Sequence, residues 1–319
     1  MARETTRQID LVLAAPRPLT VHPAAVYLSS LTSGSRRTME KSLNVIARML
    51  TAPVESDALS LDWSKLRYQH TAAIRSVLME QYAPATVNRM LCALRRVLQE
   101  AHHLRLISTD DYATAINLKS VQGDSPLRGR LLKPSEIAAL LSDCKNDLTL
   151  IGKRDAALIA ILSGSGLRRS ELVALDTVDY KTEDSSLLVR KGKGRKSRTV
   201  YLPSGAVAAL EDWLVERGNA PGALICPVRR GGHIKVGRMT DQAVMTILRK
   251  RASCASVAAF SPHDFRRTFI TNLLAAGVDV LTVSRLAGHA DPATTAKYDL
   301  RSEEFKRQAV QLLHVPYGE

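Results

Sequence analysis

The chain has 319 residues, is 45% hydrophobic and only 4% aromatic, and is long enough for two domains with mainly helical cores. Lysine and arginine number 45 against 31 acidic residues, and the formal charge of +14 favours an extended polyanion such as DNA or RNA over a basic protein with no such partner. The cysteine spacing argues against zinc and disulfide frameworks, and no apolar run is long enough for a signal core or membrane span, so we expect a soluble, cytoplasmic protein.

The first part of the chain is expected to be helical. We expect residues 1–20 to form a loose arm and residues 21–117 a helical domain, because apolar residues such as Leu43, Ile46 and Leu50 recur at helical spacing. Several arginines stand beside Ser, Thr and Asn residues that favour helix starts, where free N–H groups bind phosphates well. A solvated charged face is the alternative for each. The candidate DNA-binding residues here are Arg36, Arg37, Arg89, Arg95 and Arg96.

Glycine, proline and serine interrupt the periodicity over residues 118–133, which predicts an extended basic linker. A second domain is predicted over residues 134–319, with a helix starting at Pro134 and another from about residue 155. Residues 186–190 and 198–202 have the pattern of two strands joined by a turn rich in glycine and lysine. The remainder is expected to be helical, and helix 241–252 is a candidate reader of DNA bases. The candidate residues at its start are Arg238, Thr240 and Gln242.

An arginine follows the glycine turn at residues 164–166. If the segment from Arg168 to Leu175 is helical, Arg168 lies on the same stripe as Leu172 and Leu175. A guanidinium within an apolar face is costly unless it is paired, and Glu171 can pair with it. This reading favours a functional arginine, with a purely structural Arg–Glu pair as the alternative.

A second embedded arginine follows Ser261-Pro262, a good pair of residues to begin a helix. In that helix Arg266 lies between two apolar positions, and His263 lies one turn before it. Arginine matches phosphate oxygens bidentately. Two embedded arginines and a histidine therefore predict a pocket for an anion.

Lys193 lies between two glycines in the turn that joins the strands, where it could enter a DNA groove and protonate a leaving oxygen. A solvated turn is the alternative. Further along, His289 connects a helix over residues 279–288 to another that starts at Asp291-Pro292, and Tyr298 follows. A tyrosine is a poor nucleophile alone, but fixed cations around it enable covalent chemistry on phosphorus. The other candidate DNA-binding residues of the turn are Lys191, Arg195 and Lys196.

Taken in order, these segments resemble the tyrosine recombinase (phage integrase) family of site-specific DNA recombinases. The resemblance rests on Gly-Leu-Arg-x-Ser-Glu-Leu, Gly-Lys-Gly, His-x-x-Arg, Gly-His and a final Tyr, and it runs from about residue 134 to 300, with a weaker match in the helical region before it. It implies a mainly α fold: an N-terminal helical core-binding (SAM-like) domain, and a mostly helical catalytic domain with a small antiparallel β-sheet, forming a C-shaped DNA clamp.

The resemblance also implies a role for each residue. Arg168, Arg266 and His289 would bind the scissile phosphate and stabilise charge on its oxygens. Tyr298 would attack and form a 3′-phosphotyrosyl link, with Lys193 as general acid and His263 assisting proton transfer. Glu171 would orient the site. Neither a metal, a cofactor nor ATP would be needed.

The implied partners are double-stranded DNA with inverted-repeat core sites and three further copies of the chain. A homo-tetramer would act on two DNA sites through a Holliday junction, with accessory DNA-bending proteins, while the free, nucleoid-associated protein would be a monomer or weak dimer. Residues 302–314 would form an exchange helix, although packing on its own domain is the alternative. Two other functions stay open: a type IB topoisomerase-like nicking-closing enzyme, and a catalytically silent DNA-binding relative.

Overall fold

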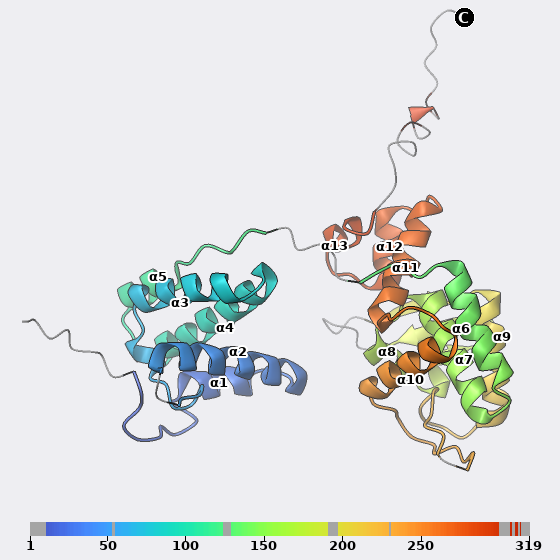
Figure 1. Cartoon of the computed structure of the whole chain (residues 1–319), viewed down its shortest axis with the longest axis horizontal. Coiled ribbons are helices and arrows are strands. Elements are labelled where there is room, and N and C mark those ends of the chain that lie inside the picture. Colours follow the sequence, from blue (N-terminus) through green and yellow to red (C-terminus); the bar gives the residue numbers. More distant parts are fainter. Residues whose placement is uncertain are drawn as a thin grey trace, which may run out of the picture. The chain divides into compact units, whose positions relative to one another are not determined.

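The chain divides into two compact units, Met1–Arg128 and Gly129–Glu319. The computed structural model describes residues 11–52, 55–123, 129–190, 197–229 and 231–299, together with residues 307, 310, 311 and 313. Figure 1 labels the helices of both units, and the prediction of a mainly helical fold is confirmed. The predicted clamp concerns the relative placement of the units and stays a prediction. None of the described helices is both long enough and apolar enough to span a membrane.

The first unit is built around one long helix with an apolar stripe. Its elements are α1 (Pro23–Ser29), α2 (Ser33–Thr51), a 3-10 turn (Trp63–Lys65), α3 (Tyr68–Gln81), α4 (Pro84–His103) and α5 (Thr109–Ile116). In α4, Val87, Leu91, Leu94 and Leu98 recur at helical spacing and are fully buried. The helices α1, α2, α3 and α5 all pack on α4, so this stripe forms the centre of the first core.

The prediction of a loose arm over residues 1–20 is wrong from Leu11 onward. The Leu11 side chain belongs to the first core, and the Leu11 carbonyl accepts a hydrogen bond of 2.7 Å from the Asp62 amide. Arg17 Nη2 forms an ion pair with the Asp62 carboxylate at 2.9 Å. Residues from Leu11 onward are therefore held on the first unit, while residues 1–10 lie outside the described residues.

The linker expected over residues 118–133 is divided between the two units. On the first unit, Leu118 is buried and the Val121 amide donates to Asn88 Oδ1 at 2.8 Å. On the second, the Leu132 amide donates to Thr268 Oγ1 at 2.9 Å, and the Arg130 amide donates to Asp264 Oδ1 at 3.0 Å. Backbone groups at each end of the segment form hydrogen bonds with the unit to which that end belongs. Local sequence patterns do not reveal these contacts, because the partners are distant along the chain.

The second unit surrounds a buried helix. Its helices are α6 (Pro134–Asn146), α7 (Leu150–Ser165), α8 (Arg169–Ala174), a 3-10 turn (Thr177–Asp179), α9 (Ser204–Arg217), α10 (Asp241–Cys254), α11 (Pro262–Ala275), α12 (Val280–Ala287) and α13 (Pro292–Ala296). Helix α7 packs against α6, α9 and α11. Its run of apolar residues, including Leu158, Ile159 and Ile161, is buried on every side, as expected of a helix at the centre of a domain.

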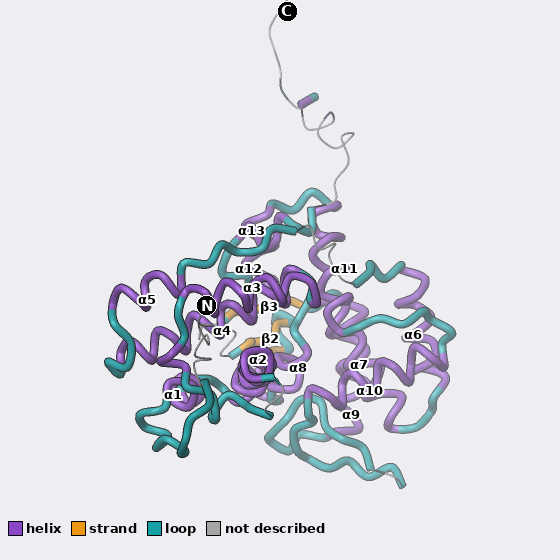
Figure 2. Tube along the Cα trace, turned by 60° about the vertical axis from the view of Figure 1, so that its left-hand side comes forward, coloured by secondary structure: helices purple, strands orange, loops and turns teal. Residues whose placement is uncertain are grey.

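A small antiparallel sheet stands beside these helices. Within the described residues its strands are β1 (Tyr180–Lys181), β2 (Ser186–Val189) and β3 (Arg198–Tyr201), in the order β1-β2-β3. Leu187 pairs with Val200, and both side chains face the core. The two predicted strands are therefore confirmed, whereas the two-residue β1 was too short to give a pattern. Figure 2 colours the strands orange and shows how small the sheet is beside the helices.

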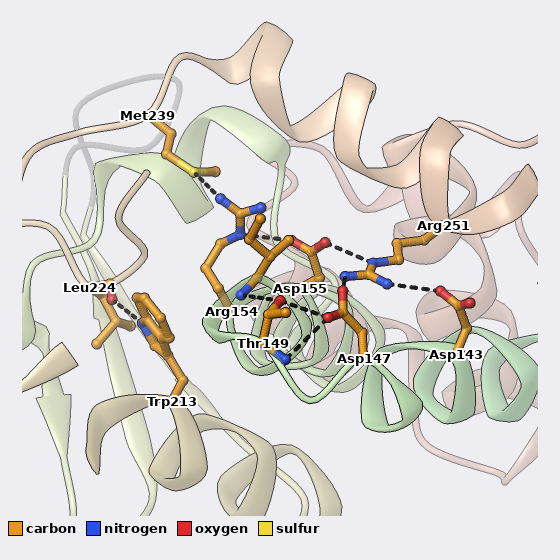
Figure 3. Close-up of polar contacts among 10 residues, drawn as sticks. Asp143, Asp147, Thr149, Arg154, Asp155, Trp213, Leu224, Met239 and Arg251 are labelled. Atoms are coloured by element: carbon orange, nitrogen blue, oxygen red, sulfur yellow. Dashed lines mark hydrogen bonds and ion pairs between the residues drawn. The ribbon is translucent and has the colours of Figure 1, made fainter. Parts of the chain in front are cut away.

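An ion-pair network ties α10 to α6 and α7 (Figure 3). Arg251 donates through Nε to Asp155 at 2.7 Å, through Nη1 to Asp143 at 3.0 Å and through Nη2 to Asp147 at 2.7 Å. Arg154 donates to the other oxygen of Asp155 at 2.7 Å. The buried charges are thus paired and hydrogen-bonded, so the network fixes how these three helices pack.

Candidate active site

The turn between α7 and α8 places the first arginine of the site. Gly166 ends α7 with a positive φ of 60°, and an added Cβ would lie 2.4 Å from the Phe269 ring. The predicted helical stripe is wrong here, because α8 begins only after Arg168 and ends before Leu175. Arg168 is instead the N-cap residue, and its side chain is 30% exposed. Its guanidinium therefore lies beside the helix, where a ligand can reach it.

The carboxylate of Glu171 holds two arginines. It accepts from the Arg168 amide at 2.9 Å and from Arg168 Nη1 at 2.8 Å. It also accepts from Arg198 Nη1 at 3.0 Å and from Arg198 Nη2 at 2.8 Å. Burial by itself raises the pKa of Glu171, but the hydrogen bonds from Arg198 and Arg168 outweigh burial and lower the pKa to about 2. The predicted Arg168–Glu171 pair is present, and the carboxylate is ionised and fixed.

Arg198 belongs to the site, although the sequence pattern at this position predicts only a strand. Besides Glu171, it contacts the end of α12, because Nε donates to the Leu286 carbonyl at 3.0 Å. Arg168 Nη2 reaches the same region at the Gly288 carbonyl, 3.3 Å away. The available signal was strand alternation, since Arg198 shares the face of buried Val200. An arginine on the inward face of a strand needs a partner, and Glu171 is that partner.

Helix α11 contributes a nearly fully buried arginine. Its N-terminus is fixed by a capping box in which the Asp264 carboxylate accepts from the Ser261 amide at 2.8 Å. Arg266 is 1% exposed, and Nη1 donates to the Gly166 carbonyl at 2.9 Å. Burial, followed by the charge of Arg168, lowers the pKa of Arg266 to about 10, so the guanidinium is still charged at neutral pH. Its Nη2 is buried and has no hydrogen-bond partner among the described residues, which suits an incoming anion.

Tyr298 lies against the side chains of α11. Its hydroxyl is 3.2 Å from His263 Nε2, and the guanidinium of Arg267 stands over its ring, 5.6 Å from the centroid. The Tyr298 residue is only 7% exposed and packs with Ile270 and Leu274 of α11. Burial, and then the charges of Arg266 and Arg267, lower the pKa of His263, so its ring is neutral at neutral pH and able to accept a proton.

His289 occupies the connection between α12 and α13. Its Nδ1 is 2.7 Å from Thr295 Oγ1, and its ring stacks on that of Tyr298 with centroids 6.2 Å apart. Burial, followed by the charges of Arg266 and Arg168, lowers the pKa of His289 to about 4. The predicted helix ends are confirmed: Asp279 caps α12, Gly288 ends it in the left-handed region, and Asp291 caps α13.

The structure thus gathers most of the predicted catalytic residues in one place. The residues brought together are Arg168, Glu171, His263, Arg266, His289 and Tyr298. The predicted turn residues Lys191, Lys193, Arg195 and Lys196 lie outside the described residues, as does nearly all of the predicted exchange helix over residues 302–314. The arrangement of cations, a neutral histidine and a phenol suits attack on a phosphodiester.

The predicted DNA-binding residues fall into two groups. Arg36, Arg95 and Arg238 have intramolecular partners: Arg36 Nε donates to the Leu28 carbonyl at 2.8 Å, Arg95 Nε to Ile116 at 3.3 Å, and Arg238 Nη1 to Val173 at 2.6 Å. These bonds satisfy carbonyls at or near the ends of helices, which gives the three arginines a structural role. Thr240 likewise caps α10. The second group consists of Arg37, Arg89, Arg96 and Gln242, which are exposed, as are Arg36, Arg238 and Thr240 of the first group.

Comparison with known proteins gives a consistent result. Residues 130–304 match the model of the phage integrase family. The chain is 31% identical over 255 residues to the tyrosine recombinase XerC of Myxococcus xanthus, which covers 76% of this chain and 81% of that protein. It is 33% identical over 250 residues to the tyrosine recombinase XerD of Ralstonia nicotianae, covering 75% and 76%.

Solved structures share the fold. The integrase of transposon Tn1549, in complex with transposon right-end DNA, has a TM-score of 0.68 at 16% identity and covers 92% of this chain and 98% of its own. The XerH site-specific recombinase, bound to a palindromic difH substrate, has a TM-score of 0.67 at 19% identity and covers 94% and 97%. At these identities the likeness concerns the fold alone.

Proposed function

Because the chain belongs to the phage integrase family of tyrosine recombinases, we propose that it is a site-specific DNA recombinase that cuts and rejoins strands through Tyr298. The observation that carries this assignment is the Tyr298 hydroxyl, 3.2 Å from His263 Nε2 and close to a buried Arg266 whose Nη2 has no acceptor among the described residues. A phenol, a proton acceptor and an unsatisfied cation in one site are the parts needed to attack a phosphodiester.

In the first step, the Tyr298 oxygen attacks phosphorus, and the bond from phosphorus to the 5′-oxygen breaks. His263 accepts the phenol proton, because its lowered pKa keeps the ring neutral at neutral pH. The leaving 5′-oxygen takes up a proton, for which Lys193 is the proposed donor. The products are a 3′-phosphotyrosyl link and a free 5′-hydroxyl.

Arg168, Arg266 and His289 stabilise the negative charge that develops on the non-bridging oxygens. Arg266 contributes most directly, because it is buried and the attraction between a buried charge and the phosphate is stronger than it would be in water. Arg168 is held by Glu171, so its guanidinium loses little conformational entropy when phosphate binds. Glu171 is thus a positioning residue.

In the second step, a 5′-hydroxyl of the partner DNA attacks the phosphotyrosine and releases Tyr298. One phosphodiester is exchanged for another, so ATP is not required. We propose double-stranded DNA with inverted-repeat core sites as substrate, and a homo-tetramer that passes through a Holliday junction, assembled from a monomer or weak dimer with accessory DNA-bending proteins. The DNA complexes among the structural relatives support DNA as the partner. An exchange helix over residues 302–314 and a cytoplasmic, nucleoid-associated location also belong to this proposal.

The test uses suicide substrates, which trap the covalent intermediate, prepared from the DNA that flanks the gene. Wild-type protein is expected to form an adduct that mass spectrometry locates at Tyr298, and Tyr298→Phe to form none. Tyr201→Phe, at an exposed tyrosine of β3, is the matched control and retains the adduct. An adduct formed by Tyr298→Phe would refute the assignment. Resolution of synthetic Holliday junctions then separates recombination from simple nicking and closing.

A further inference from the structure

Thr295 contacts both His289 and Tyr298, yet the proposed chemistry gives it no part. It lies in α13 and is fully buried, with its hydroxyl 2.7 Å from His289 Nδ1. Its carbonyl accepts a hydrogen bond of 2.9 Å from the amide of Tyr298. One residue therefore connects the histidine and the nucleophile whose rings stack on each other.

The contact with His289 raises the question of which atom carries the proton. His289 faces the cations Arg266, Arg168 and Arg198, and its lowered pKa makes the ring neutral at neutral pH. A neutral imidazole has a single N–H, at either Nδ1 or Nε2, and the partner of one nitrogen decides the state of the other. Nε2 forms no hydrogen bond with any residue in the described part of the chain, so Thr295 is the deciding partner.

The environment of the hydroxyl selects one arrangement. Within the described residues, Thr295 Oγ1 has no hydrogen-bond partner other than His289 Nδ1. If Nδ1 carried the proton and donated to Oγ1, the hydroxyl proton of a fully buried side chain would lack an acceptor, which is costly. If the hydroxyl donates to Nδ1, both groups are satisfied and the imidazole proton lies on Nε2.

We propose that Thr295 is a positioning residue that fixes His289 in the tautomer protonated at Nε2. This tautomer presents an N–H donor, and a donor is what a non-bridging phosphate oxygen requires. The other tautomer would turn a lone pair toward the phosphate and repel it. The consequence for catalysis rests on the proposed function, whereas the tautomer itself is a property of the free protein.

The first experiment reads the tautomer without DNA. In the full-length protein with ¹⁵N-labelled histidine, nitrogen-detected NMR at neutral pH distinguishes protonated from unprotonated ring nitrogens, and His289→Ala identifies the relevant signals. Wild-type protein and Thr295→Ser are expected to show protonated Nε2, whereas isosteric Thr295→Val is expected to show a mixture. Thr294→Val, at the exposed neighbour in the same helix, should match wild type. A wild-type signal from protonated Nδ1 overturns the proposal.

The second experiment measures single-turnover cleavage of the suicide substrate at saturating protein. Thr295→Val is expected to slow adduct formation by about 10-fold or more while DNA affinity changes little, and Thr295→Ser to restore most of the rate. In a His289→Ala background, Thr295→Val should add almost no further loss, because the hydroxyl acts through the imidazole. Independent, additive losses would point to a merely structural role and refute the proposal.

The two arms separate failure of this inference from failure of the proposed function. If wild-type protein forms no adduct on any flanking DNA, the recombinase assignment fails, and the NMR arm still decides the tautomer. If wild-type protein forms the adduct and Thr295→Val does so equally fast, the function stands and the role of Thr295 is rejected.

Discussion

At the scale of single residues, Arg198 links β3 to α8 and to the end of α12. It donates to both oxygens of Glu171 and to the Leu286 carbonyl. Replacing it with methionine keeps much of the side-chain volume but leaves a buried carboxylate with fewer donors. We expect Arg198→Met to lower the free energy of unfolding by about 1–3 kcal/mol. Because Glu171, which holds Arg168, loses its donors from Arg198, we expect Arg168 to be less firmly positioned and adduct formation to slow by up to about 100-fold.

The two effects of Arg198→Met can be told apart with a second substitution. Glu171→Gln in the same protein removes the carboxylate charge that has lost its Arg198 partner, so the unfolding free energy in urea should recover while cleavage stays slow. DNA binding, measured in parallel, should change by less than about threefold, because Arg198 makes its contacts within the protein. Full recovery of cleavage in the double variant would show that Arg198 serves stability alone.

The pKa of His289 predicts a dependence of stability on pH. Its folded-state pKa of about 4 lies below the unfolded value of 6.5, so the unfolded chain binds the proton more readily. The stability associated with the neutral ring is complete above the unfolded value and is lost as pH falls from about 6.5 to 4. Since the ring is half-exposed, we expect this loss to be on the order of 1 kcal/mol.

Urea unfolding of wild-type protein and His289→Gln at neutral pH and near pH 5 measures this loss. On acidification, the unfolding free energy of wild-type protein should fall by more than that of His289→Gln. His263, whose pKa is also lowered, is present in both proteins and largely cancels. A difference that stays constant between the two pH values would contradict the low pKa of His289.

The sequence identified the residues that gather in the candidate site better than the residues that hold them in place. Arg266, His289 and Tyr298 stand in motifs whose local spacing is visible along the chain. Arg198 pairs with a carboxylate 27 residues away, and only the fold reveals that contact. Thr294 and Thr295 are indistinguishable in the sequence, and the packing of α13 decides which of them is buried. Contacts between segments that are distant along the chain could not be predicted, because local sequence patterns do not contain them.

At the scale of elements, helix ends determine where the site residues lie. Ser261 before α11, Asp279 before α12 and Asp291 before α13 were all readable, because capping depends on neighbours within one turn. The predicted start of α8 is wrong because a six-residue helix presents too few positions to establish a period. This error mattered for Arg168, whose guanidinium is reachable because it precedes the helix.

Gly288 is the helix end on which His289 depends most directly. Its φ of 67° is in the left-handed region, and an added Cβ would lie 2.7 Å from Arg198 Nη1. Gly288→Ala therefore combines backbone strain of about 1–2 kcal/mol with displacement of Arg198. We expect lower stability, measured by thermal unfolding, together with adduct formation slowed by about 10-fold or more.

Gly277 provides the matched control for this substitution. It also has a positive φ, 87°, but an added Cβ meets nothing within 4 Å. Gly277→Ala should show the loss of stability from backbone strain and nearly unchanged cleavage. If the two variants cleave equally slowly, strain in the backbone, rather than the position of Arg198 and His289, accounts for the effect.

At the scale of the whole molecule, the division between the units was predictable only in part. The composition of residues 118–133 indicates a break in the helical pattern, and the units divide between Arg128 and Gly129. Both flanks of that segment are nevertheless held by hydrogen bonds to distant residues, such as Leu132 to Thr268. Composition detects the interruption of a helix but not the surface on which the extended chain lies.

The formal charge of +14 predicts that DNA binding weakens steeply with salt, because each neutralised phosphate releases counterions. Arg89 is exposed on α4, whereas Arg95 in the same helix donates to the carbonyls of Ile116 and Leu118. If Arg89 contacts a phosphate, Arg89→Ala should reduce the slope of log affinity against log salt by about 0.9 without loss of stability.

Arg95→Met is the comparison variant, and for it we expect a change in stability rather than in the salt slope. Its loss should lower the free energy of unfolding, because two carbonyls near the end of α5 lose their donor, while the salt slope stays as in wild type. Both variants are measured by fluorescence anisotropy on flanking DNA over a range of salt concentrations and by urea unfolding. A reduced slope for Arg95→Met, with intact stability, would mean that this guanidinium leaves the carbonyls for a phosphate and belongs to the DNA-binding surface after all.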